Sequence, residues 1–165
     1  MDAKSSGNIV VLVGATTDAM GGSHVLMIEP DTNCNNALPT VSLVDGPKQA
    51  KVVHQAIRAG LIESAHDCSE GGLLVAAAEM AFGGSLGLEL HVVGEVEFEA
   101  FCFGETPSRY LLEVSPKNLD EVMSILADVF HAAIGTLNET NQLTIGEFSW
   151  SLDDLRTTWM QGMVV

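Results

Sequence analysis

The sequence Ala65-His66-Asp67-Cys68-Ser69-Glu70-Gly71-Gly72-Leu73-Leu74 is the stretch around which we expect this chain to fold. A short apolar run ends in polar side chains, two glycines follow, and a second apolar run of helical length continues to Phe82. This order predicts a buried strand, a tight turn and a buried helix. Because the free backbone N–H groups of a helix N-terminus attract anions, the turn is a candidate binding site as well as a helix cap.

The whole sequence of 165 residues suits a single domain, residues 1–165, with one hydrophobic core. Hydrophobic residues make up 47% and charged residues 18%, which excludes a disordered chain. The net charge of −15 and the seven lysines and arginines argue against nucleic acid or an anionic membrane surface as a partner. No basic leader and no apolar run of 18 residues is present, so we expect a cytoplasmic protein.

The three cysteines, Cys34, Cys68 and Cys102, lie far apart and form no C-x-x-C pair. This pattern predicts free thiols in a reducing compartment and neither a zinc site nor a disulfide framework.

Hydrophobic periodicity predicts an α+β fold in which helices pack in layers on a mixed sheet. The 24–28 stretch fits either a strand or a short helix, 41–44 fits an extended segment, and 94–100 resembles a solvated surface. We expect 142–148 to return as the hairpin partner of 132–137, and a Ser-x-x-Asp pattern to begin the last helix at Ser151. The expected strands are 9–14, 61–65, 88–92, 110–114, 132–137 and 142–148, and the expected helices are 47–59, 73–82, 116–130 and 151–163.

Two of these helices carry residues whose surroundings can be anticipated. Helix 47–59 places Ala50, Val53, His54 and Ile57 on one face, which we expect to meet the core with His54 at its edge. Glu79 is the one charge in the apolar helix 73–82, and a buried carboxylate needs a partner. Arg109 is a candidate for this partner, and it can also form an ion pair with Glu105.

Three blocks in a fixed order resemble one family. The first is Asp67-Cys68-Ser69-Glu70-Gly71-Gly72-Leu73 with Ala78-Glu79-Met80-Ala81-Phe82, Gly87 and Glu89. The second is Gly104-Glu105-Thr106-Pro107-Ser108-Arg109-Tyr110 followed by Leu112-Glu113-Val114, and the entry (13–23) and closing (135–146) segments also fit. The chain resembles, over nearly its whole length, the C-terminal domain of phosphoribosylformylglycinamidine synthase, of the aminoimidazole ribonucleotide synthetase-related superfamily.

The resemblance implies a domain of an ATP-dependent ligase of purine synthesis, which converts formylglycinamide ribonucleotide and glutamine to formylglycinamidine ribonucleotide. It also implies that the chain is a fragment, inactive alone, whose partners are N-terminal-type domains of the same synthase and a glutaminase subunit or domain. ATP or ADP and Mg²⁺ would be bound mostly by those other domains. Where the family's first C-terminal-type domain has Glu-Ser-Gln, this chain has Glu105-Thr106-Pro107, which indicates the auxiliary site of such an enzyme.

The candidate site is the mouth of the central turn. Backbone N–H groups and hydroxyls there suit a phosphate, and the two carboxylates of the turn suit Mg²⁺. The alternative interpretation of Asp67 and Ser69 is a helix N-cap. The predicted phosphate or nucleotide ligands are Ser69, Gly71, Gly72, Ser108 and Arg109, the last two from the resemblance, and the predicted metal ligands are Asp67 and Glu70.

Two other functions remain open at this point. One is another ATP-using member of the superfamily: aminoimidazole ribonucleotide synthetase, selenophosphate synthetase or thiamine-monophosphate kinase. The other is a purely structural module that docks subunits and binds no ligand.

Overall fold

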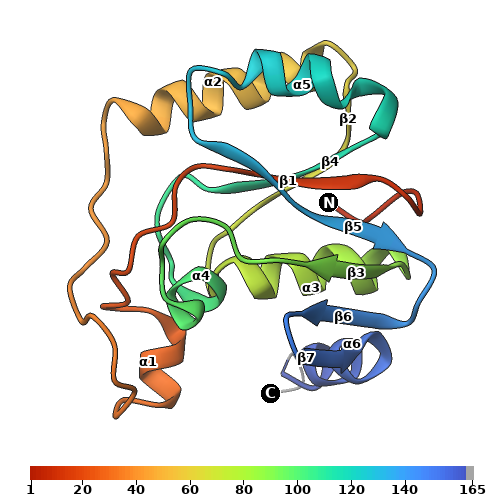
Figure 1. The fold of residues 1–165 in the computed structure, drawn as a ribbon. Helices are drawn as coiled ribbons and strands as arrows, with labels where there is room; N and C mark the ends of the chain where they lie inside the picture. The colour runs from red at the N-terminus through yellow and green to blue at the C-terminus, as the bar shows by residue number, and fades with distance from the viewer. Residues whose placement is uncertain (163–165) are drawn as a thin grey trace.

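The computed structural model describes residues 1–162, which form a seven-stranded mixed sheet with helices on both faces (Figure 1). The strand order is β2-β4-β1-β5-β3-β6-β7, and the β3–β6 pair is parallel while the other pairs are antiparallel. This confirms the predicted α+β class. The strands are β1 (Ile9–Val13), β2 (Ile62–Asp67), β3 (Gly87–Leu90), β4 (Tyr110–Val114), β5 (His131–Asn138), β6 (Gln142–Ile145) and β7 (Phe148–Ser151).

Six α-helices are described, together with one 3-10 turn. None of them is long and apolar enough to cross a bilayer. Met163, expected on the apolar side of the last helix, lies outside the described residues. The helices are α1 (His24–Ile28), α2 (Asp45–Arg58), α3 (Gly72–Gly84), α4 (Phe98–Phe103), α5 (Leu119–Ile125) and α6 (Leu152–Gln161), and the 3-10 turn is Pro116–Asn118.

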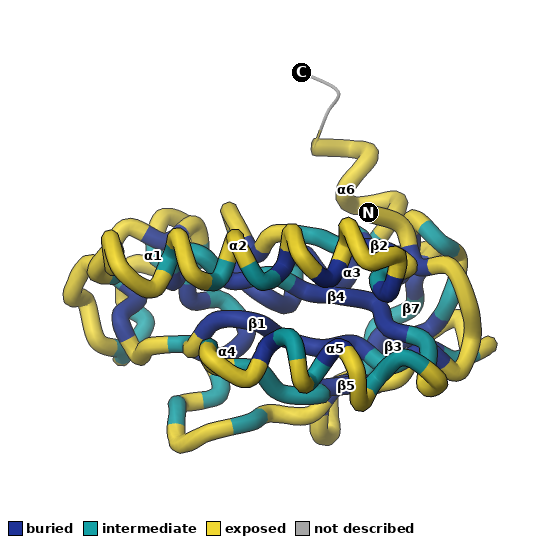
Figure 2. The backbone as a smooth tube through the Cα atoms, turned by 90° about the horizontal axis from the view of Figure 1, so that it is seen from above, coloured by how far each residue is buried: buried dark blue, intermediate teal, exposed yellow. Residues whose placement is uncertain are grey.

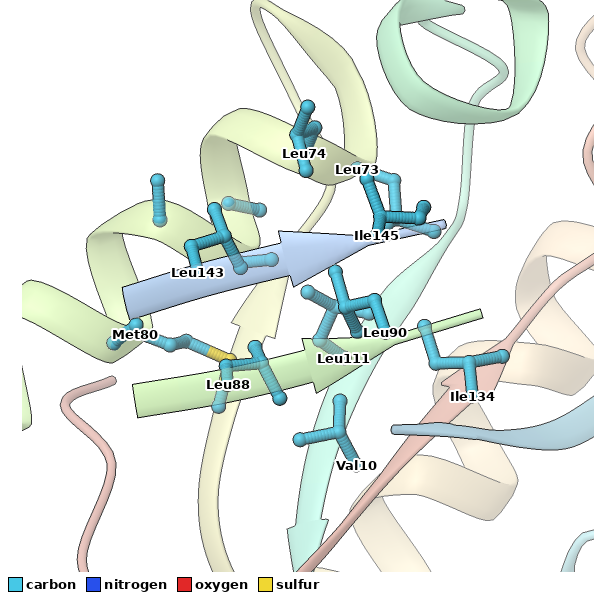
Figure 3. Close-up of a cluster of buried hydrophobic side chains, with 14 of the residues drawn as sticks. Val10, Leu73, Leu74, Met80, Leu88, Leu90, Leu111, Ile134, Leu143 and Ile145 are labelled. Carbon is cyan, nitrogen blue, oxygen red and sulfur yellow. The ribbon is translucent and has the colours of Figure 1, made fainter. Parts of the chain in front are cut away.

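The sheet separates two hydrophobic cores. Along β1, Val10 and Leu12 point to one core while Val11 and Val13 point to the other, as expected for a strand buried on both faces. Helices α2 and α5 cover one face and α3 covers the other, so that the buried backbone lies between them (Figures 1 and 2). The larger core gathers apolar side chains of α3 against the sheet (Figure 3), among them Leu73, Met80, Leu88, Leu111, Ile134 and Leu143.

The predicted hairpin of 132–137 with 142–148 is wrong. Both edges of β5 are occupied, by β1 and by β3, so β6 has no place beside it. Strand β6 instead lies parallel to β3 and forms its hairpin with β7, through Gly146 at φ +57°.

Several helix and strand details also differ from the expectations. Strand β2 is half exposed because it lies at the sheet edge. Of the two alternatives left open for 24–28, the structure has the short helix. The 41–44 stretch ends in a turn and forms no strand, and 98–103 forms α4, which buries Phe101. The 116–130 helix ends at 125. Helix α2 packs through Val53 and Ala56, so Ala50, His54 and Ile57 are exposed.

The N-terminal segment is fastened to the sheet by one buried carboxylate. Glu113 of β4 has no exposed surface, and it accepts hydrogen bonds from the backbone N–H groups of Lys4 and Ser5 at 2.9–3.0 Å. The side chains of Asn8 and Ser64 donate to the same carboxylate at 2.7 and 3.0 Å. A buried charge without a cation is tolerated here because several donors satisfy its oxygens.

We expect Glu113→Gln to lower the free energy of unfolding by about 2–3 kcal/mol, because an NH₂ group would face donors that need an acceptor. Urea denaturation of the two proteins measures the difference. Glu89→Gln on β3 is the matched control, since Glu89 is exposed and its change should be within about 0.5 kcal/mol. Equal losses in both variants would contradict this role of Glu113.

Candidate functional site

An open cleft of about 820 Å³ lies where β2 meets α3, beside the loop that leads into β4. The structure brings five of the seven predicted site residues to its walls: Asp67, Ser69, Glu70, Ser108 and Arg109. Gly71 and Gly72 do not line it. His66, Cys68, Glu105 and Tyr110 are further lining residues, together with the aliphatic side chains of Val53 and Ile57 from α2.

The turn depends on its two glycines. Gly71 and Gly72 have φ of +78° and +77°, a conformation that side chains with a Cβ rarely adopt. A Cβ on Gly72 would also lie 2.7 Å from the carbonyl carbon of Phe103. The sequence Gly-Gly is therefore required where α3 begins against the end of α4.

The N–H groups predicted to bind a phosphate already have partners within the chain. The Gly71 N–H donates to Oε1 of Glu105 at 2.9 Å, and the Gly72 N–H donates to the Ser69 carbonyl at 3.1 Å. A phosphate at this helix end would have to displace the Glu105 carboxylate. The cap alternative for Asp67 and Ser69 is wrong, because the N-cap residue is Gly71 and no side chain of the turn caps α3.

Arg109 is placed differently from the prediction. It is 1% exposed, and its guanidinium donates to the carbonyls of Gly104 and Thr106 and, at 2.9 Å, to the Thr16 hydroxyl. Burial lowers its pKa, and the nearby Cys68 and Glu105 act in the opposite direction. Its expected ion pair with Glu79 or Glu105 is not formed. Although Arg109 lines the cleft, its guanidinium donates to groups of this chain and holds the loop from Gly104 in shape.

Glu105 joins two parts of the chain at the rim of the cleft. Besides the Gly71 N–H, its Oε1 accepts the backbone N–H of His24 at 2.9 Å and faces His24 Nδ1 at 3.0 Å. Burial raises the pKa of this carboxyl, but the two N–H groups and the His24 ring together outweigh burial and hold the pKa below its usual value of 4.5. The sequence shows Glu105 but gives no sign that it accepts a hydrogen bond from Gly71, 34 residues earlier.

Glu79 is bound by His66 and Trp159. His66 Nε2 faces Glu79 Oε2 at 3.0 Å, and the Trp159 indole N–H donates to Oε1 at 2.8 Å. The other ring nitrogen of His66 faces the Asp67 carbonyl at 2.7 Å. Both ring nitrogens are therefore engaged, and His66 fastens the end of β2 to α3 and is not free as a catalytic base.

The predicted metal ligands, Asp67 and Glu70, both lie exposed at the cleft. Among residues 1–162 no three His, Cys, Asp or Glu side chains form a group that could hold a metal ion by themselves. Mg²⁺ commonly uses one or two carboxylates and completes its shell with water and phosphate oxygens, so these two residues fit it only together with a phosphate ligand. The cysteines are free as predicted, and burial raises the pKa of Cys68 and Cys102 to about 12.

Comparison with known proteins decides the family. Residues 5–146 match the family described as AIR synthase related protein, C-terminal domain. The chain belongs to this family.

Relatives of this C-terminal domain include the phosphoribosylformylglycinamidine synthase subunit PurL of two organisms. The Methanosarcina barkeri protein is 36% identical over 158 residues, which are 91% of this chain and 21% of the relative. The Alkaliphilus metalliredigens protein is 34% identical over 136 residues, 81% of this chain and 18% of the relative. The chain thus spans about a fifth of the length of the curated relatives that it matches.

Solved structures share the fold. T. maritima PurL complexed with FGAR superimposes with a TM-score of 0.81 at 18% identity, over 93% of this chain and 28% of that one. E. coli HypE, a hydrogenase maturation protein, gives a TM-score of 0.66 at 14% identity, over 91% of this chain and 50% of that one. Both comparisons support the predicted AIR synthetase-type C-terminal fold.

We expect Gly72→Ala to destabilise the chain more than Gly60→Ala does. Gly60 has φ +73° with open space around its Cβ position, so its substitution costs about 1–2 kcal/mol for the backbone conformation alone. Gly72→Ala should cost a further 1–3 kcal/mol or so, because its Cβ collides with backbone of the Phe103–Gly104 segment. Denaturant unfolding measures both values, and equal costs would contradict the close approach.

We expect Glu105 to contribute stability that acid removes. Because the pKa of its carboxyl is lowered in the folded state, the contribution is complete above the ordinary value of 4.5 and is lost as pH falls through the lower folded value. The difference in unfolding free energy between wild type and Glu105→Gln should therefore shrink from about pH 5 toward pH 3. A matched Glu63→Gln variant, changed at an exposed glutamate of β2, should show no such trend. A pH-independent difference for Glu105 would contradict its role.

Proposed function

We propose that the chain is the C-terminal domain of a phosphoribosylformylglycinamidine synthase that works in the cytoplasm. The observation that carries the proposal is the family match over residues 5–146 together with PurL relatives that are 31–36% identical. In this reaction ATP transfers its terminal phosphoryl group to the formamide oxygen of formylglycinamide ribonucleotide. Ammonia from glutamine then attacks the carbon that bears this oxygen, so that a C–N bond forms, the C–O bond breaks and the oxygen leaves as part of inorganic phosphate.

We further propose that residues 1–165 are one domain of a longer synthase and are inactive alone. The other partners are N-terminal-type domains of the same synthase and a glutaminase subunit or domain. A structure described as PurLQS from Thermotoga maritima supports the existence of further subunits in that organism.

The cleft is proposed to bind the phosphate of a nucleotide such as ATP or ADP. Neighbouring T. maritima PurL structures are described as complexes with ATP, ADP and AMPPCP. In this chain the Ser69 and Ser108 hydroxyls would face the phosphate, and Asp67 and Glu70 would reach it through Mg²⁺, because two carboxylates would otherwise repel it. Arg109 supports this site from behind, and the Gly71 and Gly72 N–H groups could join it only when Glu105 moves away.

The structural docking module remains a second candidate. It is favoured by one specific observation, namely that the chain's own carboxylate occupies the Gly71 N–H at the helix N-terminus. Because a carboxylate of the chain itself already lies at this helix N-terminus, the domain needs no bound anion there for stability.

The test uses the complete synthase that contains this chain, assayed for phosphate release that depends on formylglycinamide ribonucleotide, ATP and ammonium. Wild type should release phosphate, and Glu70→Gln should lower kcat/KM for Mg·ATP by about tenfold or more, equivalent to about 1.4 kcal/mol. Glu63→Gln, outside the cleft, is the control and should leave the rate unchanged.

The outcomes separate the candidates. Wild type without substrate-dependent phosphate release contradicts the proposed enzyme. An active wild type with unchanged Glu70→Gln and Ser108→Ala variants contradicts the ligand site in this cleft and favours the docking module.

A further inference from the structure

A 21-residue segment, 24–44, lies on the surface without a single buried residue. It contains α1 and the chain that leads to α2, at one end of the molecule (Figure 1). Six of the thirteen large hydrophobic side chains exposed among the described residues belong to it. They are Met27, Ile28, Leu38, Val41, Leu43 and Val44, and their exposed fractions run from 60% to 85%.

Packing within this chain does not account for the conformation of the segment. Helix α1 has five residues, no side-chain cap and no buried side chain, whereas isolated helices shorter than about 12 residues are marginal in water. The six side chains expose an apolar surface on the order of several hundred Å², close to the roughly 800 Å² that each partner buries in a specific interface. A surface of this composition is typical of one that another protein surface covers.

The segment nevertheless makes specific contacts with the rest of the domain. At its start, the His24 N–H and ring are held by Glu105. Just beyond its end, in the first turn of α2, a Cβ on Gly46 would lie 2.9 Å from Ser108 Oγ. Both ends therefore meet the loop that lines the cleft. Between them the backbone of 35–37 accepts hydrogen bonds from Met20 and Gly21 at 2.8 and 2.9 Å.

Charge and chain length indicate what covers it. The 24–44 segment carries Glu29 and Asp31 and no lysine or arginine, in a chain with a net charge of −15. A second copy of this chain would bring the same sign of charge to the contact, which is unfavourable. The relatives are about five times longer than the matched region, so a synthase of that length has other domains available to cover this surface.

We propose that the 24–44 segment is the docking surface for another domain of the same synthase, one that presents an apolar face with a basic rim. This inference rests on the proposed function, because it requires a longer synthase. Since the chain at both ends of the segment contacts the loop that lines the cleft, the docked domain also borders the cleft. It supplies cationic groups to a wall on which the Arg109 guanidinium already donates its hydrogen bonds within the chain.

Hydrogen exchange of backbone amides tests the proposal. The amides of 24–44 should exchange about tenfold or more slowly in the complete synthase than in the 165-residue chain. Leu43→Lys, which places a charge at the most exposed leucine of the segment, should restore fast exchange in the complete synthase and leave the melting temperature of the 165-residue chain unchanged. Val92→Lys, at an exposed apolar residue outside the segment, is the matched control and should alter neither measurement.

Equal exchange rates in the complete synthase and the 165-residue chain would overturn the proposal. Protection already present in the 165-residue chain, with a doubled sedimentation mass, would also overturn it and assign the surface to a second copy. The substrate-dependent phosphate release assay is separate. An active synthase with an unprotected segment contradicts only the docking surface, whereas a protected segment in an inactive synthase contradicts only the proposed reaction.

Discussion

The buried guanidinium of Arg109 is the interaction on which the candidate site depends. It holds the carbonyls of Gly104 and Thr106, so that the loop before β4 curls around one side chain. The desolvation of a guanidinium is costly unless each donor finds an acceptor, and this requirement fixes the loop. The same loop carries Glu105, which accepts the Gly71 N–H just before α3 and holds His24, and Ser108, which adjoins the start of α2.

Carboxylates accept many of the side-chain hydrogen bonds that join distant segments of this acidic chain. Glu113 holds the N-terminal segment, Glu105 joins α1 to α3, and Glu79 joins α3 to His66 and to Trp159 of α6. Their partners are mainly neutral N–H and O–H groups and histidine rings. Hydrogen bonds to a charged acceptor are stronger than bonds between neutral groups. The fold is therefore stabilised although the chain has few cations.

Local patterns in the sequence predict much of this fold, and long-range partners are what they miss. Strands β1 and β4 and helix α3 follow from apolar runs and from Gly71-Gly72, because these signals act within a few residues. The partner of β6 depends on which edges of β5 are already taken, and no turn between 138 and 141 reveals that. The resemblance identifies the family, and five of the seven predicted residues line one cleft. The occupied Gly71 N–H depends on Glu105, a residue 34 positions later, and the inward direction of Arg109 depends in part on Thr16, 93 positions earlier.

Hydrogen exchange of the Arg109→Lys variant tests most directly whether this guanidinium organises the site. A lysine can satisfy only part of the three-acceptor arrangement, so the loop should loosen and Glu105 should release its donors. The Gly71 and His24 amides should then lose protection, while the Lys4 amide, held by Glu113, keeps its own. Unchanged protection of Gly71 and His24 in this variant would contradict the account.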